Sequence, residues 1–188
     1  MGRGSNLRSV IHVVALKKKH PGQTAFDTLS DSINATSLHF EQESLSFAKN
    51  VSIPVCYSEK FALDHSVFKR KGIALKQLAE LHMSKTYRVF MLGFLPGFPY
   101  MAEVDEKLVA SRKEVPRAHV AAGSVGIAGK QTGIYPLNSP GGWQIIGRTP
   151  WKLFNRQRAE PVLLQPGDNV TFYSISEDEF ENYQGGPS

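Results

Sequence analysis

The sequence contains one cysteine, Cys56, in 188 residues, so no disulfide can form within the chain. Cys56 lies in the run VSIPVCY, which is mostly apolar. A free cysteine in such a run is typical of a packed core, where it behaves as a small hydrophobe. We therefore expect a buried structural thiol and no disulfide scaffold of the kind that small secreted domains use.

Long apolar runs are also missing. Although 41% of the residues are hydrophobic, no run approaches the roughly 20 residues that a membrane-spanning helix needs. The first residues, MGRGSNLRS, lack the apolar core of a secretory signal peptide. These absences predict a cytoplasmic globular protein of about one or two domains, with no membrane partner.

The charge is only moderately positive, with 22 Lys and Arg against 17 Asp and Glu, a formal net charge of +5. Nucleic acid is one class of partner for such a charge. However, the two basic clusters, at residues 17–19 and 69–71, contain no aromatic side chains on which bases could stack. We therefore expect solvated surface charge and no nucleic-acid partner.

Two runs of the sequence resemble known functional motifs but lack residues that those motifs require. GSVGIAGKQT resembles a phosphate-binding loop, yet Ser124 stands where the pattern needs glycine and Gln131 where it needs Ser or Thr. AGSVG resembles a nucleophile elbow, but Ala122 replaces its first glycine, and His119 is too close in sequence for a usual triad. The six histidines show no metal-ligand spacing. The sequence thus predicts no metal site and leaves the catalytic residues unidentified.

The segment 117–150 is the part of the chain most indicative of function. Its seven glycines alternate with residues that strands bury, such as Val125, Ile127 and Trp143. Glycine within a strand marks a bulge, a corner or a close approach of the backbone. The glycines are Gly123, Gly126, Gly129, Gly133, Gly141, Gly142 and Gly147. We therefore expect short, closely packed strands here and a functional site among them.

The rest of the chain predicts a mixed architecture. Residues 9–16 have strand character, residues 74–84 carry leucines at helical spacing, and a helix is predicted within 23–49. From Tyr87 onward, short apolar runs separated by Gly, Pro and Asn indicate an all-β sandwich or barrel, with a last strand at 169–175. We therefore predict an α+β N-terminal domain at 1–86, an all-β domain at 87–176 and a tail at 177–188.

The run GFLPGFPYM, residues 93–101, fixes its backbone with prolines and carries several aromatic rings. Such a loop serves either as a well-packed barrel corner or as a rigid wall for a ligand. SPGGWQIIGRTP has similar chemistry, with a tight turn at Gly141 and Gly142 beside Trp143. Arg148 in this run would either bind a carboxylate or phosphate or cap strand carbonyls.

Three cations within the glycine-rich segment, Arg117, Lys130 and Arg148, suit an anionic group such as a carboxylate, carbamate or phosphate. Neighbouring polar side chains could bind an amide, although no acid–base pair stands out. The predicted substrate-binding residues are Phe94, Pro96, Phe98, Tyr100, Arg117, Ser124, Lys130, Gln131, Tyr135, Ser139, Gly141, Gly142, Trp143, Gln144 and Arg148.

Four blocks of the sequence also resemble one protein family. They are IPVCY at 53–57, YRVFMLGFLPGFPYM at 87–101, AGSVGIAGKQTGIYPLNSPGGWQIIGRTP at 122–150, and LLQPGDNVTFYSI at 163–175. Together they resemble the family of the 5-oxoprolinase B subunit, also called allophanate hydrolase subunit 1 or the KipI family. The resemblance implies a ferredoxin-like α+β domain followed by a cyclophilin-like β-barrel. Residues 1–49 match the family poorly, so the first domain is expected to be truncated, divergent or differently paired.

The resemblance implies a hydrolase component that works with a homologous C subunit, which is KipA-like, and with an amidohydrolase-like A subunit. Together they would open 5-oxoproline, a lactam, to glutamate with ATP. Carboxyl transfer to a urea-type amide and KipI-like inhibition of a sensor histidine kinase are the alternatives. No biotin-attachment motif is present. The sequence departs from the family motif at Ala118, His119, Ala121 and Lys130, which predicts altered specificity.

Overall fold

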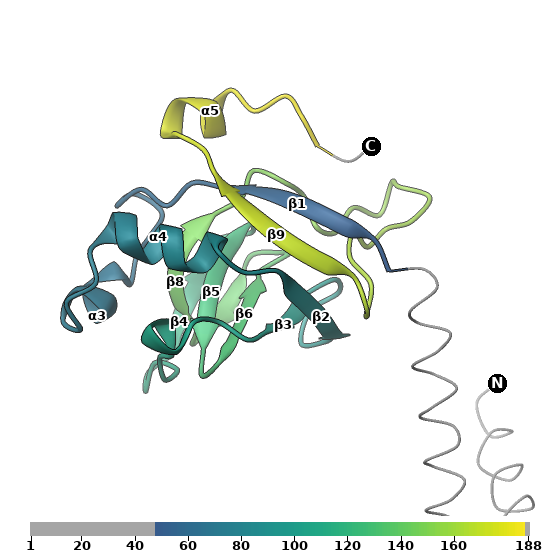
Figure 1. Ribbon diagram of the computed structural model, residues 1–188. Helices are drawn as coiled ribbons and strands as arrows, with labels where there is room; N and C mark the ends of the chain where they lie inside the picture. Colours follow the sequence, from purple (N-terminus) through teal and green to yellow (C-terminus); the bar gives the residue numbers. More distant parts are fainter. Residues whose placement is uncertain (1–47, 187–188) are drawn as a thin grey trace, which may run out of the picture. The chain divides into compact units, whose positions relative to one another are not determined.

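The computed structural model describes residues 48–186, which form part of one compact unit. A seven-stranded sheet runs in the order β1-β9-β2-β3-β6-β5-β8, and a two-stranded sheet pairs β4 with β7 (Figure 1). The strands are β1 (Asn50–Val55), β2 (Tyr87–Leu92), β3 (Pro99–Ala102), β4 (Arg117–Val120), β5 (Ser124–Ala128), β6 (Gln131–Ile134), β7 (Ser139–Gly141), β8 (Gln144–Arg148) and β9 (Asn169–Ser174).

The large sheet curls until its two edge strands meet. β1 pairs in parallel with β9, and Cys56, the residue after β1, forms an antiparallel bridge with Arg148 at the end of β8. The amide of Cys56 lies 2.8 Å from the carbonyl oxygen of Arg148, and the reverse pair is separated by 3.0 Å. The mostly β, barrel-like architecture is thereby confirmed, because the bridge leaves little free edge. The finer description as cyclophilin-like stays a prediction.

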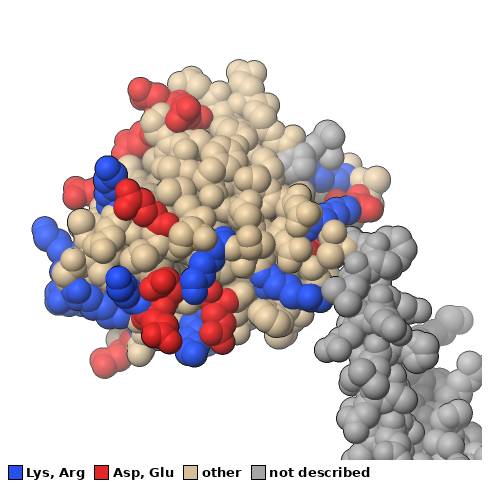
Figure 2. Space-filling model, in the orientation of Figure 1, with Lys and Arg blue, Asp and Glu red and all other residues tan. Residues whose placement is uncertain are grey.

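Four short helical segments accompany the strands. They are α3 (His65–Lys69), α4 (Leu75–Met83), the 3₁₀ turn η1 (Glu106–Leu108) and α5 (Glu177–Glu181). The helix predicted at 74–84 is confirmed as α4, which buries Leu78 and His82 against the core. None of the helices within 48–186 is both long and apolar enough to cross a bilayer. On the face shown in Figure 2, positive and negative side chains are interspersed.

β1, α3 and α4 belong to the same compact unit as the barrel strands, although the sequence grouped residues 50–86 with the N-terminal domain. β1 lies beside β9 in the sheet, and Ile53 and Leu78 share one core with the barrel residue Val125. A parallel pairing between residues 119 positions apart leaves no local pattern that sequence inspection can read. The strand predicted at 9–16 and most of the helix predicted within 23–49 lie outside the described residues, and the ferredoxin-like description of the N-terminal domain stays a prediction.

His82 joins α4 to the barrel through a buried network. Its Nε2 lies 2.9 Å from Thr132 Oγ1, and its Nδ1 lies 2.7 Å from the Tyr57 hydroxyl. Thr132 donates its own hydroxyl proton to the carbonyl oxygen of Gly126, so Oγ1 accepts from Nε2–H and Nδ1 accepts from Tyr57. The imidazole stacks on Phe172 at 4.6 Å between ring centroids. Burial lowers the pKa of His82 from 6.5 to about 3, so the ring is neutral.

The depressed pKa of His82 predicts a pH-dependent stability. Below pH 6.5 the imidazole of His82 is protonated in the unfolded chain, whereas in the folded chain it stays neutral until about pH 3. The free energy of unfolding should therefore fall by about 1.4 kcal/mol for each pH unit of acidification in this window. In His82→Gln this contribution should be absent. Urea titrations between pH 4 and 7 measure it, with the exposed His119→Gln as matched control. Parallel wild-type and His82→Gln profiles would contradict the expectation.

Candidate functional site

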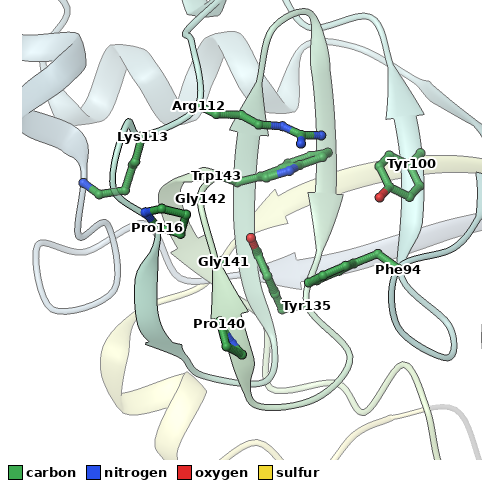
Figure 3. Close-up of a pocket in the computed structure, with 10 residues that line it drawn as sticks. All are labelled: Phe94, Tyr100, Arg112, Lys113, Pro116, Tyr135, Pro140, Gly141, Gly142 and Trp143. Atoms are coloured by element: carbon green, nitrogen blue, oxygen red, sulfur yellow. The ribbon is translucent and has the colours of Figure 1, made fainter.

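A cavity of about 300 Å³ opens beside β3 and the turn between β7 and β8. Three segments that are distant in sequence build it: the β2–β3 hairpin, residues 112–116 before β4, and the β6–β8 region (Figure 3). The lining residues are Phe94, Tyr100, Arg112, Lys113, Pro116, Tyr135, Pro140, Gly141, Gly142 and Trp143. Its walls are mainly aromatic, which is typical of small-molecule sites.

The aromatic wall is held by edge-to-face packing around Phe98. The ring of Phe98 is buried, with its centroid 5.2 Å from those of both Tyr135 and Trp143 at interplanar angles of 85° and 82°. Tyr100 packs against Trp143 at 5.7 Å between centroids. Such contacts fix ring orientation and add about 0.5–1.5 kcal/mol per pair beyond burial. The wall is therefore preorganised.

Phe94 stands at the mouth of the cavity in an unusual conformation. Its φ of 67° is in the left-handed region, which non-glycine residues rarely adopt. Pro96 and Gly97, whose φ is 80°, close the tight turn behind it. Phe94 remains 63% exposed. Backbone strain of this kind gathers at functional sites and is consistent with a ligand wall.

Asp64, which precedes α3, holds the opposite wall. Its carboxylate accepts hydrogen bonds from Arg117 Nη1 and Nη2 at 2.6 and 2.7 Å, from Lys113 Nζ at 3.0 Å and from the Ile145 amide at 2.7 Å. Burial alone would raise the pKa of the Asp64 carboxyl, but the donors Arg117, Ile145 and Lys113 outweigh it, so the pKa lies below its ordinary value. The ionised carboxylate therefore fixes residues 113–117 against β8.

Arg112 has a different environment from its two basic neighbours. Its guanidinium carbon lies 5.8 Å from the centroid of the Trp143 ring. In Figure 3 it lies over Trp143 and points towards Tyr100, whereas Lys113 points away from the centre of the cavity. No ion pair joins Arg112 to a carboxylate of residues 48–186. It is therefore a cation of the cavity that Asp64 does not neutralise.

The structure brings six of the predicted residues together in this lining: Phe94, Tyr100, Tyr135, Gly141, Gly142 and Trp143. Their role as ligand contacts stays a prediction. The sequence analysis missed Arg112, Lys113, Pro116 and Pro140. The run RKEVPR at 112–117, a proline between basic residues just before the glycine-rich segment, was the available signal.

Several other predicted residues lie behind the lining. Phe98 supports the rings, and Gln144 is buried, with Nε2 donating to the Ser111 carbonyl oxygen at 2.8 Å and Oε1 lacking a partner among the described residues. Ser124 is buried in β5, and Ser139 Oγ donates to the carbonyl oxygen of Pro140. Pro96, Gln131 and Lys130 are not part of the lining, and Lys130 Nζ lies 3.6 Å from Glu103 on the surface.

The three cations predicted to share an anion site are not assembled in this cavity. Arg117 is committed to Asp64. Arg148 donates from Nε to the Ala122 carbonyl oxygen at 2.9 Å, and its guanidinium carbon lies 5.9 and 5.7 Å from the ring centroids of Phe61 and Phe180. Its carbonyl-capping alternative therefore describes it better. The trio was inferred from one segment of the sequence, but Arg117 begins β4 in the two-stranded sheet, Lys130 lies in the turn between β5 and β6, and Arg148 ends β8 in the large sheet.

Comparison with known proteins shows to which family the chain belongs. A family model described as the carboxyltransferase domain, subdomain C and D, matches residues 7–164. The chain belongs to this family. The curated B subunit of the 5-oxoprolinase of Bacillus subtilis is 46% identical over 135 residues, which are 71% of this chain and 56% of that protein. The resemblance inferred from the four sequence blocks is confirmed, and the chain spans little more than half the length of this relative.

More distant relatives and solved structures agree. The urea amidolyase of Saccharomyces cerevisiae is 36% identical over 118 residues, which are 58% of this chain and 6% of that protein. A solved structure of a conserved uncharacterized protein from Pyrococcus horikoshii superposes with a TM-score of 0.67 at 40% identity, covering 86% of this chain and 74% of that one. The barrel is thus shared by the family.

Gly141 and Gly142 provide a matched test of the cavity wall. A Cβ on Gly141 would lie 2.7 Å from Tyr135 Cε1 and Cζ, whereas a Cβ on Gly142 would have Lys113 O at 3.7 Å as its nearest neighbour. Gly141→Ala should therefore displace Tyr135 and lower the free energy of unfolding by about 1–3 kcal/mol. Gly142→Ala should change it by less than about 0.5 kcal/mol. Thermal and urea unfolding measure both, and equal stabilities would contradict the packing described.

Replacing Asp64 with Asn tests the opposite wall. The amide keeps an acceptor for Ile145 but removes the charge that binds Arg117 and Lys113. We expect a loss of roughly 2–3 kcal/mol in the free energy of unfolding, because two partly buried cations lose their counter-ion. Glu103→Gln makes the same chemical change in an exposed pair. It should cost less than about 0.5 kcal/mol, so comparable losses in the two variants would refute the role of Asp64.

Proposed function

We propose that this chain is one component of an ATP-dependent 5-oxoprolinase, which opens 5-oxoproline to glutamate together with a homologous C subunit and an amidohydrolase-like A subunit. The observation that carries the proposal is the aromatic cavity. Seven of its ten lining residues lie in GFLPGFPYM and the glycine-rich segment, which belong to two of the four blocks that resemble the B subunit, and the other three lie at 112–116. The identity to the B subunit of Bacillus subtilis supports the same reaction.

The cavity suits a small flat amide or lactam. Trp143, Tyr100 and Phe94 supply faces and edges against which a five-membered ring can pack. Gly141 and Gly142 have no side chains, so a ligand can approach the backbone closely at that wall. Burial raises the pKa of the Tyr135 hydroxyl, which keeps it protonated and able to donate a hydrogen bond to an amide oxygen.

The lining also supports a component that does not complete the reaction alone. None of its ten described residues is Asp, Glu, His or Cys, the usual groups for proton transfer or nucleophilic attack. We therefore infer that this chain binds and orients the lactam, and that the groups which move protons come from a partner protein. A partner surface would close over the exposed Phe94 at the cavity mouth.

A nucleotide fits this cavity poorly. About 300 Å³ is at the lower end for small-molecule sites. The cavity offers Arg112, whereas Lys113 is already paired with Asp64. A triphosphate requires several such donors or a cradle of backbone amides. We infer that the ATP of the proposed reaction binds outside this cavity.

Carboxyl transfer to a urea-type amide is a second candidate. It is favoured by the name of the matching family model and by the identity to a urea amidolyase. Both reactions begin with a small planar amide at the same wall. The two candidates differ in their product, so a single reconstituted complex can be assayed for both.

Release of glutamate from 5-oxoproline by the reconstituted complex, with and without ATP, tests the proposed function. Tyr135→Phe should lower kcat/KM about tenfold, because it removes a hydrogen bond to the amide worth about 1–1.5 kcal/mol. Tyr173→Phe, which changes an exposed hydroxyl paired with Tyr183, should have no effect. A complete, stable complex that releases no glutamate would contradict the proposal. Carboxylation of urea by the same complex, supplied with carboxybiotin as the carboxyl donor, would favour the second candidate.

A further inference from the structure

Charge is distributed unequally on the loop that forms one wall of the cavity. Arg112, Lys113 and Arg117 lie within six residues that also contain the exposed Glu114, which forms no ion pair among residues 48–186. The carboxylate of Asp64 pairs with Lys113 and Arg117. Its two oxygens bind Arg117 in a fork and also accept from Lys113. Asp64 forms no ion pair with Arg112. The wall therefore keeps an uncompensated positive charge at Arg112.

The position of Arg112 leaves its donors available. The guanidinium lies over the Trp143 ring at 5.8 Å and extends towards Tyr100, across the cavity that these rings line (Figure 3). A guanidinium held over an aromatic face at this distance can still donate its N–H groups to a ligand. No carboxylate of residues 48–186 forms an ion pair with them.

The chemistry that would complete this arrangement is a carboxylate. Two parallel N–H groups of arginine match the two oxygens of a carboxylate. Arg112 is exposed, so the paired N–H···O geometry, rather than burial, would supply most of the attraction. A neutral amide such as urea would leave the charge of Arg112 uncompensated.

We propose that Arg112 is a specificity-determining residue that binds a carboxylate on the ligand. On this proposal, the cavity selects small planar amides or lactams that carry a carboxylate over neutral amides. The inference rests on the proposed function for the location of the ligand, and it favours a carboxylated lactam over urea at this site. Asp64 acts as a positioning residue, because it occupies Lys113 and Arg117 and holds the loop in place.

Direct binding to the full chain tests the inference. Trp143 lies in the cavity and Trp151, whose Nε1 donates to the Tyr183 hydroxyl, is not part of its lining. In a Trp151→Phe background, fluorescence therefore reports on Trp143. The probes are 5-oxoproline and its neutral carboxamide, together with benzoate and benzamide as a pair that lacks the lactam. We expect each carboxylate to bind about tenfold more tightly than its amide partner.

The variants separate charge from packing. Arg112→Gln should abolish the preference for carboxylates, Arg112→Lys should retain part of it, and Arg156→Gln, the same change at another exposed arginine, should leave it unchanged. Because Arg112 is exposed, its variants should keep the wild-type melting temperature.

The outcomes distinguish this inference from the proposed function. A preference for benzoate that Arg112→Gln abolishes, without binding of either lactam, would support Arg112 as an anion site and count against 5-oxoprolinase. Equal binding of carboxylates and amides, a preference that survives Arg112→Gln, or no binding of either carboxylate would overturn the inference. Glutamate release by the complex with unchanged kinetics in Arg112→Gln would overturn it and leave the proposed function standing.

Discussion

The carboxylate of Asp64 connects three parts of the chain that are far apart in sequence. It lies just before α3, binds the side chains of Lys113 in the loop before β4 and of Arg117 at the start of β4, and accepts from the amide of Ile145 in β8. The Asp64 amide also donates to the Ile145 carbonyl oxygen at 2.9 Å. Because Asp64 is only 4% exposed, these donors replace the water that a charged carboxylate would otherwise require.

The cavity depends on this connection and on the aromatic cluster opposite. One wall is polar and fixed by charge, while the other is apolar and fixed by edge-to-face contacts around Phe98. Between the two walls lies Gly141, where a Cβ atom would clash with the ring of Tyr135. A preorganised cavity loses little conformational freedom when a ligand binds, which is an advantage for a small ligand with few atoms to contribute affinity. The proposed ligand, a carboxylated lactam, matches both walls.

Two side chains that could act in binding or catalysis, Arg148 and His82, have structural roles in this fold. Arg148 lies at the bridge that closes the barrel, where it caps a carbonyl and packs against the contacting rings of Phe61 and Phe180. His82, a potential proton carrier, is buried and kept neutral between Tyr57 and Thr132. Both ring nitrogens of His82 are occupied by protein groups, whereas Arg148 has its Nε bonded to a protein carbonyl oxygen and its guanidinium packed against two rings.

The sequence by itself determined the elements whose signals are local. Leucine spacing predicted α4, alternating apolar residues and turns predicted a β architecture with a final strand at β9, and contiguous motifs predicted the family and six residues of the cavity. Tertiary structure alone decided that β1 joins β9, that Asp64 takes Arg117, and that Arg112 is left over Trp143. These contacts join residues 31 to 119 positions apart, and such distances are set by the closure of the sheet, which no local pattern records.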